Sequence, residues 1–251
     1  MKIPTMNLQY LKHYFYHFFP KSCYLCGQDI PRIFGNAQLY PICDLCISCL
    51  PFVEYCCPRC GLEDKSRKDT LCGNCLRKLP AYERVVHTFW YEMPIQQMLQ
   101  QYKFHQKLYW GAILAKFMLQ RIQSCYADKP LPECIVPVPL HPERLKERGY
   151  NQTYELAKYL SHYLNIPLNW KYCQRTISTQ PQSTLDRKAR KKNVKNAFQS
   201  LAIPYQRIAL LDDIMTTGET MSSLCRSIKA ANPSVKIDVW CCARTKSLNV
   251  C

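Results

Sequence analysis

The sequence predicts an α/β fold, with a mostly parallel sheet flanked by helices and a small cysteine-rich module at the N-terminus. Three observations support this. From residue 81 onward, strand-like segments alternate with segments of helical periodicity. Ten of the 17 cysteines lie between Cys23 and Cys75. Two adjacent carboxylates, Asp212 and Asp213, follow the apolar run 208–211, where a strand buried on both faces should end.

Three segments are expected along the chain. Residues 1–20 are rich in aromatic side chains, end at Pro20 and contain only two lysines, so a docking segment is favoured over a membrane-surface helix. Residues 21–80 form the cysteine module. Residues 81–251 form the α/β domain. The whole chain is 47% hydrophobic, which suffices for a core.

The cysteine module carries four C-x-x-C pairs, the ligand spacing of structural Zn²⁺ sites. Two ions bound by sequential quartets are the default, and interleaved quartets remain open. Two further cysteines complicate the pairing. Cys46 and Cys49 form another C-x-x-C pair, and Cys56 is adjacent to Cys57. The predicted metal ligands are Cys23, Cys26, Cys43, Cys46, Cys57, Cys60, Cys72 and Cys75.

Disulfides are the alternative to zinc, and they require an oxidising compartment. The N-terminus lacks the uninterrupted apolar region of a signal peptide, and no segment approaches the ~18 apolar residues of a membrane span. We therefore expect a cytoplasmic protein with zinc. Cysteines outside the module, such as Cys134 and Cys225, should pack as small apolar side chains.

Periodicity places the elements of the α/β domain. Strands are expected at 85–91, 134–138, 168–173, 208–211 and 235–241. Helices are expected at 93–102, 109–122 and 151–164, with another beginning near Met221. The apolar face of the helix at 151–164 is expected to contain Leu156, Leu160, Tyr163 and Leu164.

The net charge of +16 is concentrated in one region. Residues 141–195 hold twelve Lys/Arg against four Asp/Glu, a net +8 in 55 residues. A basic excess of this size indicates phosphate-rich partners such as nucleic acid, and a solvated, soluble surface is the alternative interpretation.

The run IALLDDIMTTGET at 208–220 combines a buried strand, two carboxylates and a threonine-rich turn before a helix. A helix N-terminus favours an anion, and adjacent carboxylates can accept hydrogen bonds from a sugar diol. The run resembles the signature of type I phosphoribosyltransferases, which bind phosphoribosyl pyrophosphate (PRPP). The resemblance implies that Asp212 and Asp213 contact ribose with Mg²⁺ present, and that the turn binds the 5′-phosphate. The turn residues are Thr216, Thr217, Gly218, Glu219 and Thr220.

Two basic segments are placed to bind pyrophosphate or DNA. The segment 138–152 follows a predicted strand, and as an extended loop it could aim Arg144, Lys146 and Arg148 in one direction. The segment 179–193 lacks apolar periodicity and occupies the position of a flexible lid, with an exposed charged loop as the alternative. Its candidate residues are Gln182, Arg187 and Arg190.

The order of these motifs is similar to that of the ComF family. The resemblance rests on the cysteine module, VPVPLHPERLKERGYNQ, RKARKKNVKNAF, LLDDIMTTGET and VWCCART, and it spans about residues 23–245. It implies a type I phosphoribosyltransferase-like domain and a cytoplasmic role in handling imported single-stranded DNA. Natural transformation or DNA utilisation would be the context, with the DNA-uptake machinery as a partner.

Whether the chain is an enzyme stays open at this level. Its second half also resembles amidophosphoribosyltransferase, but no cysteine follows Met1 and a module of 80 residues could not hold the glutaminase domain of that enzyme. Phosphoribosyl transfer needs no side-chain nucleophile, so no catalytic residue is assigned. A DNA-handling protein that binds PRPP is favoured, and a phosphoribosyltransferase acting on a base or amine is the alternative.

Overall fold

The computed structural model describes residues 22–30, 41–64, 70–176 and 197–246. The chain divides into two compact units between Leu50 and Pro51. The first cysteine group lies in the smaller unit and the second in the larger. The boundary expected at residue 80, between the cysteine module and the α/β domain, remains a prediction. The expectations for residues 1–20 and 179–193 lie outside the described residues.

Described by itself, the smaller unit contains one short helix, α2 (Asp44–Ser48), within its described residues. Its cysteine knuckle turns at Gly27, which has φ of +76° and whose N–H donates to the Cys23 carbonyl (2.8 Å).

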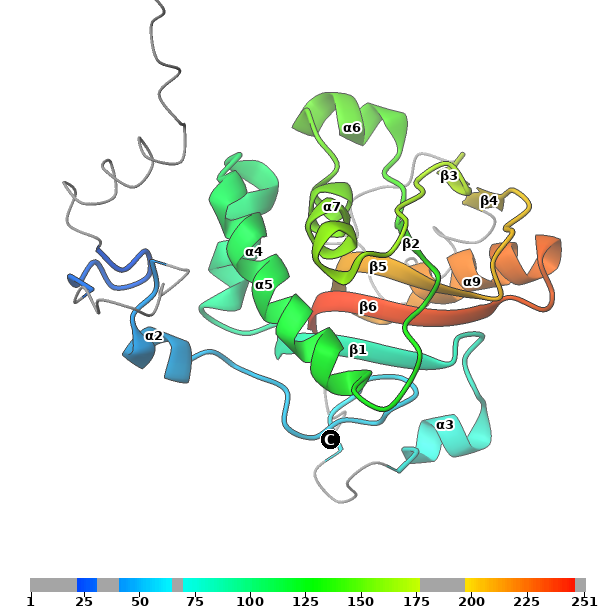
Figure 1. The fold of residues 1–251 in the computed structure, drawn as a ribbon, viewed down its shortest axis with the longest axis horizontal. Helices are drawn as coiled ribbons and strands as arrows, with labels where there is room; N and C mark the ends of the chain where they lie inside the picture. The colour runs from blue at the N-terminus through cyan, green and yellow to red at the C-terminus, as the bar shows by residue number, and fades with distance from the viewer. Residues whose placement is uncertain (1–21, 31–40, 65–69, 177–196, 247–251) are drawn as a thin grey trace, which may run out of the picture. The chain divides into compact units, whose positions relative to one another are not determined.

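The larger unit is built on a four-stranded, all-parallel sheet with strand order β1-β6-β5-β2 (Figure 1). This confirms the predicted α/β class. The strands are β1 (Arg84–Trp90), β2 (Cys134–Pro137), β5 (Arg207–Met215) and β6 (Lys236–Arg244). A separate antiparallel pair joins β3 (Cys173–Arg175) to β4 (Phe198–Ser200).

Helices cover both faces of the parallel sheet. The helices are α3 (Gly73–Arg77), α4 (Ile95–Phe104), α5 (Leu108–Cys125), α6 (Pro142–Arg148), α7 (Gln152–Leu164) and α9 (Glu219–Ala231). Helices α5 and α7 pack on one face, and α9 lies on the other (Figure 1). Leu224 and Ile228 of α9 are fully buried against Val136, Leu210 and Val239. Burial of apolar area on this scale supplies most of the driving force for folding.

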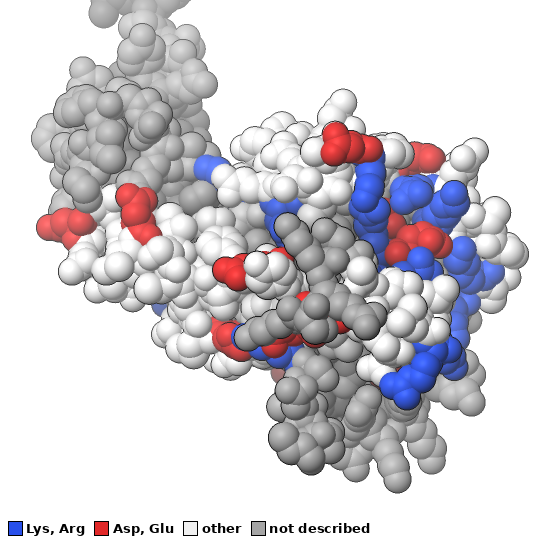
Figure 2. Space-filling view, turned by 90° about the horizontal axis from the view of Figure 1, so that it is seen from below, with Lys and Arg blue, Asp and Glu red and all other residues white. Residues whose placement is uncertain are grey.

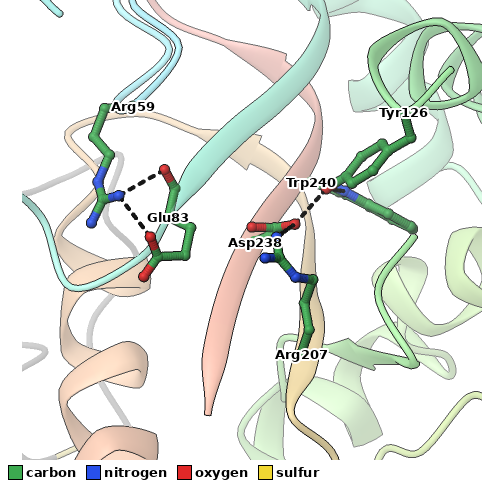
Figure 3. A network of polar contacts seen from close by, with 6 residues as sticks. All are labelled: Arg59, Glu83, Tyr126, Arg207, Asp238 and Trp240. Atoms are coloured by element: carbon green, nitrogen blue, oxygen red, sulfur yellow. Dashed lines mark hydrogen bonds and ion pairs between the residues drawn. The ribbon is translucent and has the colours of Figure 1, made fainter. Parts of the chain in front are cut away.

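Polar contacts are buried at the amino-terminal part of the central strands. Asp238 of β6 is fully buried and accepts hydrogen bonds from the Tyr126 hydroxyl (2.7 Å) and Arg207 Nη1 (3.2 Å) (Figure 3). Trp240 Nε1 donates to the same Tyr126 oxygen (3.1 Å). Because a buried carboxylate is costly unless paired, this network fixes Tyr126, the C-cap of α5, against the sheet.

Three expectations about local structure were wrong. The strand expected at 168–173 is reduced to one parallel bridge between Leu168 and Ile135. A turn follows, in which Asn169 Oδ1 accepts from the Lys171 N–H (2.8 Å), and β3 begins only at Cys173. Tyr163, expected on the apolar face of α7, is 54% exposed. The strand at 208–211 continues to Met215, so Asp212 and Asp213 lie within β5, beyond the point where β2 stops pairing with it.

The expectation of an extended loop at 138–152 was also wrong, because this segment contains helix α6. Pro142 occupies the first turn, where its missing N–H costs nothing, and Gly149 ends the helix with φ of +79°. In a helix, Arg144 and Arg148 share a face and Lys146 points elsewhere, so the three cations are not aimed in one direction.

Candidate functional site

A pocket of about 350 Å³ opens at the carboxyl ends of β2 and β5. This volume falls in the ~300–1,000 Å³ range of small-molecule sites, and the carboxyl edge of a parallel sheet is where such ligands bind. The charged and hydroxyl side chains that line it are Tyr91, Lys103, Arg144, Arg148, Thr153, Arg175, Asp212, Asp213, Thr216 and Thr220.

The two carboxylates form the floor of the polar part. The backbone N–H of Asp213 donates to Asp212 Oδ1 (2.8 Å), and Lys103 Nζ lies 2.8 Å from Asp213 Oδ1. Burial, followed by the neighbouring Asp213 charge, raises the pKa of Asp212 to about 7. Two carboxylates side by side in a partly dehydrated site oppose each other's ionisation, and the Lys103 charge offsets part of that cost.

Two buried acceptors in the pocket have no hydrogen-bond partner within the described ranges. They are Asp213 Oδ2 and Gln152 Oε1, and the two residues are 3% and 4% exposed. A buried acceptor without a donor costs roughly 1–3 kcal/mol, so such atoms are usually satisfied when a ligand binds. The pocket therefore calls for a ligand that carries hydrogen-bond donors.

The threonine-rich turn caps helix α9 beside these carboxylates. Gly218 is the N-cap of this 13-residue helix with φ of +79°, and a Cβ there would lie 2.9 Å from Met215 Cε. Thr216, Gly218 and Thr220 line the pocket. Thr217 and Glu219 do not appear in its lining; Thr217 is exposed and its hydroxyl accepts from the Glu219 N–H (3.4 Å). The N-terminus of α9 thus presents its partial positive charge to the pocket.

Cations surround the opposite side of the pocket. Arg144 and Arg148 enter from α6, and Arg175 from the end of β3. Burial lowers the pKa of Arg144 and of Arg175, and a neighbouring arginine lowers each further. Because arginine titrates far above neutral pH, both stay charged, and their mutual repulsion makes this side of the pocket attractive to an anion.

The predicted pocket residues separate into three groups. The structure brings Asp212, Asp213, Arg144, Arg148 and part of the turn together. Lys146 does not line the pocket. Gln182, Arg187 and Arg190 lie outside the described residues. Sequence reasoning missed Lys103, Gln152 and Arg175, which come from a helix, a helix start and a short antiparallel strand.

The cysteines form two groups of four in the described residues, each with its sulfur atoms within 4.8 Å of one another. The groups follow the sequential pairing, with the first two C-x-x-C pairs in one and the last two in the other. Their members are Cys23, Cys26, Cys43 and Cys46, and Cys57, Cys60, Cys72 and Cys75. Cys49 and Cys56 belong to neither. Cys134 and Cys225 are fully buried with free thiols, as expected for small apolar side chains.

Backbone donors support both groups in the same manner. The Cys43 N–H donates to Cys23 Sγ, and the Cys72 N–H donates to Cys57 Sγ, each at 3.4 Å. Four convergent sulfurs with N–H donors suit a tetrahedral metal ion bound by thiolates. None of the helices in the described ranges combines the length and apolar character needed to cross a bilayer.

Comparison with known proteins identifies the family. No protein-family model matches the chain. It is 34% identical over 235 residues to competence protein F of Haemophilus influenzae, covering 91% of this chain and 99% of that protein. The chain belongs to the ComF family. Another ComF relative, the DNA utilization protein YhgH of Salmonella typhi, is 32% identical over 230 residues, covering 90% and 98%. Competence protein ComFC of Bacillus subtilis is 28% identical over 224 residues, covering 85% and 82%.

Solved structures similar to this ComF chain include phosphoribosyltransferases, matched loosely. A purine phosphoribosyltransferase from Pyrococcus horikoshii gives a TM-score of 0.30 at 19% identity, covering 54% of this chain and 74% of that one. A xanthine-guanine-hypoxanthine phosphoribosyltransferase from Helicobacter pylori gives 0.31 at 9% identity, covering 53% and 80%. Likenesses this loose carry no argument about the site.

Proposed function

We propose that this chain binds PRPP with Mg²⁺ in the pocket and takes part in handling single-stranded DNA during DNA uptake or utilisation. The second part follows the names of its relatives, which are competence and DNA-utilisation proteins. The first part rests on the pocket. Its carrying observation is the carboxylate pair beside the N-terminus of α9, in which the buried Asp213 Oδ2 has no donor among the described residues.

The ribose ring fits the carboxylate pair. One oxygen of each carboxylate is already engaged, Asp212 Oδ1 by a backbone N–H and Asp213 Oδ1 by Lys103. The remaining oxygens can accept from the two hydroxyls of a vicinal diol. In this arrangement Asp213 Oδ2 gains its donor, and Lys103 keeps both carboxylates ionised enough to accept.

The 5′-phosphate fits the turn before α9. N–H groups of the first turn of α9, together with the hydroxyls of Thr216 and Thr220, would hold a dianion. Gly218 allows close approach of the backbone because it has no side chain. Thr217 would contribute through its backbone N–H rather than its side chain, and the Glu219 N–H would exchange its contact with Thr217 Oγ1 for a phosphate oxygen.

The pyrophosphate fits the cationic side of the pocket. Arg144 and Arg148 share one face of α6 and would pair with phosphate oxygens, with Arg175 contributing from β3. Mg²⁺, when bound with PRPP, neutralises part of the pyrophosphate charge.

We propose that both cysteine groups hold Zn²⁺, with one ion in each. The donor set supports this, since four thiolates with N–H···S support bind zinc in structural sites. The role would be structural, because such a set leaves no ligand position open. A cytoplasmic location, where cysteines stay reduced, belongs to the same proposal.

We assign the DNA-binding role to the basic region 141–195. Six of its basic residues lie between 187 and 195, outside the described residues. On the face shown in Figure 2, Lys and Arg side chains gather together with several acidic side chains, which offset part of the basic charge there. The excess positive charge that a single strand would meet is therefore assigned to the region containing Arg187 and Arg190, with Gln182 beside it.

The DNA proposal is tested by replacing Arg187, Lys188 and Arg190 together with Gln and titrating a fluorescent oligodeoxythymidine at several salt concentrations. Each phosphate contact on a single strand contributes about −0.7 to the slope of log K against log salt, so the slope should flatten by roughly 2. An unchanged slope removes DNA from this segment. If PRPP affinity falls instead while DNA binding stays, the segment acts as a cover for the pyrophosphate.

Active phosphoribosyl transfer is the second candidate. It is favoured by the three arginines that line the pocket, Arg144, Arg148 and Arg175, which match the charge that develops on a leaving pyrophosphate. Incubation of labelled PRPP with a panel of bases and amines separates the two candidates. Formation of a nucleotide product supports the enzyme, and binding without turnover supports the DNA-handling protein.

A further inference from the structure

Arg244 connects the threonine-rich turn to the body of the larger unit. It is the last residue of β6 and only 3% exposed. Its Nη1 donates to the carbonyl oxygens of Thr216 (3.1 Å) and Met215 (3.5 Å). Its own backbone carbonyl accepts from the Tyr91 N–H (2.8 Å). The guanidinium therefore binds the residues that lead into the turn, although it does not line the pocket.

The other side of Arg244 contacts the second cysteine knuckle. That knuckle turns at Gly61, which is buried and has φ of +70°. A Cβ at Gly61 would lie 3.1 Å from Arg244 Cδ, 2.9 Å from Val85 Cγ1 and 3.2 Å from His87 Cε1. The backbone of the knuckle is thus packed against the aliphatic part of Arg244, with no room for a methyl group.

The second knuckle is itself anchored to the sheet. The Val85 N–H donates to the Pro58 carbonyl (3.3 Å). Arg59, which lies between two of the knuckle's cysteines, donates through Nη1 to the carbonyl and carboxylate of Glu83 (3.0 and 2.9 Å; Figure 3). These contacts place the metal-binding turn at a fixed position beside the first residues of β1.

Packing rather than hydrogen bonding positions the middle of the Arg244 side chain. Its Nε is buried without a hydrogen-bond partner in the described part of the chain, and so are both ring nitrogens of His87 beside it. No polar contact at that point would resist a displacement of the side chain. A shift of the knuckle backbone would therefore move the guanidinium, and with it the carbonyls of Met215 and Thr216.

The first cysteine knuckle provides an internal comparison. Gly27 occupies the same position after a C-x-x-C pair and has nearly the same φ, +76°. Among the described residues, a Cβ at Gly27 would meet nothing within 4 Å. The two glycines thus share the backbone conformation, but within the described ranges only Gly61 is packed closely against the rest of its unit.

We propose that Arg244 is a positioning residue for the threonine-rich turn, and that the second cysteine group, folded around its metal ion, holds Arg244 in place. Metal binding by the second cysteine group thereby sets the geometry of the ligand pocket, whereas metal binding by the first cysteine group does not. The proposal rests on the proposed function for the identity of the ligand and for metal binding by the second cysteine group.

The test compares Gly61→Ala with Gly27→Ala. Both variants keep all eight metal-binding cysteines and carry the same backbone strain, and zinc content is measured for each. Hydrogen exchange without ligand is followed for the peptide covering 215–220. Gly61→Ala should speed its exchange by roughly tenfold, and Gly27→Ala should leave it unchanged. Equal exchange in the two variants overturns the coupling.

A second pair of variants covers the case in which Gly61→Ala fails to fold. Arg244→Met removes the donors and keeps the aliphatic part, while Arg244→Lys retains one donor. PRPP with Mg²⁺ should bind about tenfold more weakly to Arg244→Met, with partial recovery in Arg244→Lys. A purely structural Arg244 would lower the unfolding temperature of both variants without changing affinity, which contradicts the proposal. If the wild type takes up no PRPP, the proposed ligand is wrong, and exchange at 215–220 in the two Arg244 variants still decides the coupling.

Discussion

Lys103, near the end of α4, forms an ion pair with Asp213 of β5, with 2.8 Å between Nζ and Oδ1 and side chains only 15% and 5% exposed. The pair joins segments more than 100 residues apart at the floor of the pocket. Since it is nearly dehydrated, removing one partner leaves an uncompensated charge.

Lys103→Met should lower the free energy of unfolding by about 3–5 kcal/mol, because Asp213 is then buried without its cation. Adding Asp213→Asn should recover part of the loss, so the two changes will not be additive. Urea unfolding of the two single variants and the double variant gives the coupling energy. Additive losses would show that the pair contributes no interaction of its own.

The stability of the protein should depend on pH through Asp212. Burial and the Asp213 charge raise the pKa of Asp212 from 3.8 to about 7 in the folded state, so between these values the folded protein holds a proton that the unfolded chain releases. This contribution to stability is complete below pH 4 and is lost as the pH rises through 7. Asp212→Asn should flatten the profile in this window, and an identical slope in denaturation at pH 4–7 would contradict the assignment.

Zinc should be present at two ions per chain. Replacing Cys57 and Cys60 with Ser should remove one ion and destabilise the larger unit, since structural zinc contributes directly to folding. Replacing Cys23 and Cys26 should also remove one ion but leave the stability of the larger unit unchanged. Elemental analysis and thermal unfolding check both pairs. Less than half an ion per wild-type chain, or disulfides covering these cysteines, would refute the metal assignment.

Thr216 and Thr217 should differ in their effect on ligand binding. Thr216 lines the pocket and Thr217 does not. Thr216→Val should weaken PRPP binding by about 1–2 kcal/mol, the contribution of one hydrogen bond to a charged group, and Thr217→Val should have little effect. Calorimetric titration of both variants measures the difference. Equal losses would mean that the turn contacts the phosphate in a different orientation.

The carboxylate pair and the turn could be picked out from the sequence, because they are contiguous with the buried run 208–211. The helical form of α6 was missed, although Pro142 and Gly149 mark its ends, because Arg144, Lys146 and Arg148 alternate as an extended chain would require. A local pattern of charges was given more weight than the start and stop signals.

Lys103 and Arg175 could not be found from the sequence. Neither residue belongs to a recognisable sequence motif. Only the tertiary fold, which brings α4 and β3 to the pocket that β5 also lines, places them near Asp212 and Asp213. The same holds for Arg244 and Gly61, whose contact depends on where the second knuckle sits on the sheet. Long-range packing, rather than local sequence, decides which charges meet at such a site.

The central claim, a PRPP site at the carboxylate pair, is tested most directly by isothermal titration of PRPP with Mg²⁺ into the wild type and into Asp212→Asn with Asp213→Asn. The amide replacement keeps the shape of both side chains and removes their negative charge. We predict saturable binding to the wild type and none at the same concentrations to the double variant, with both proteins folded by circular dichroism. Equal affinity for the two proteins would contradict the assignment of the carboxylates to the ribose.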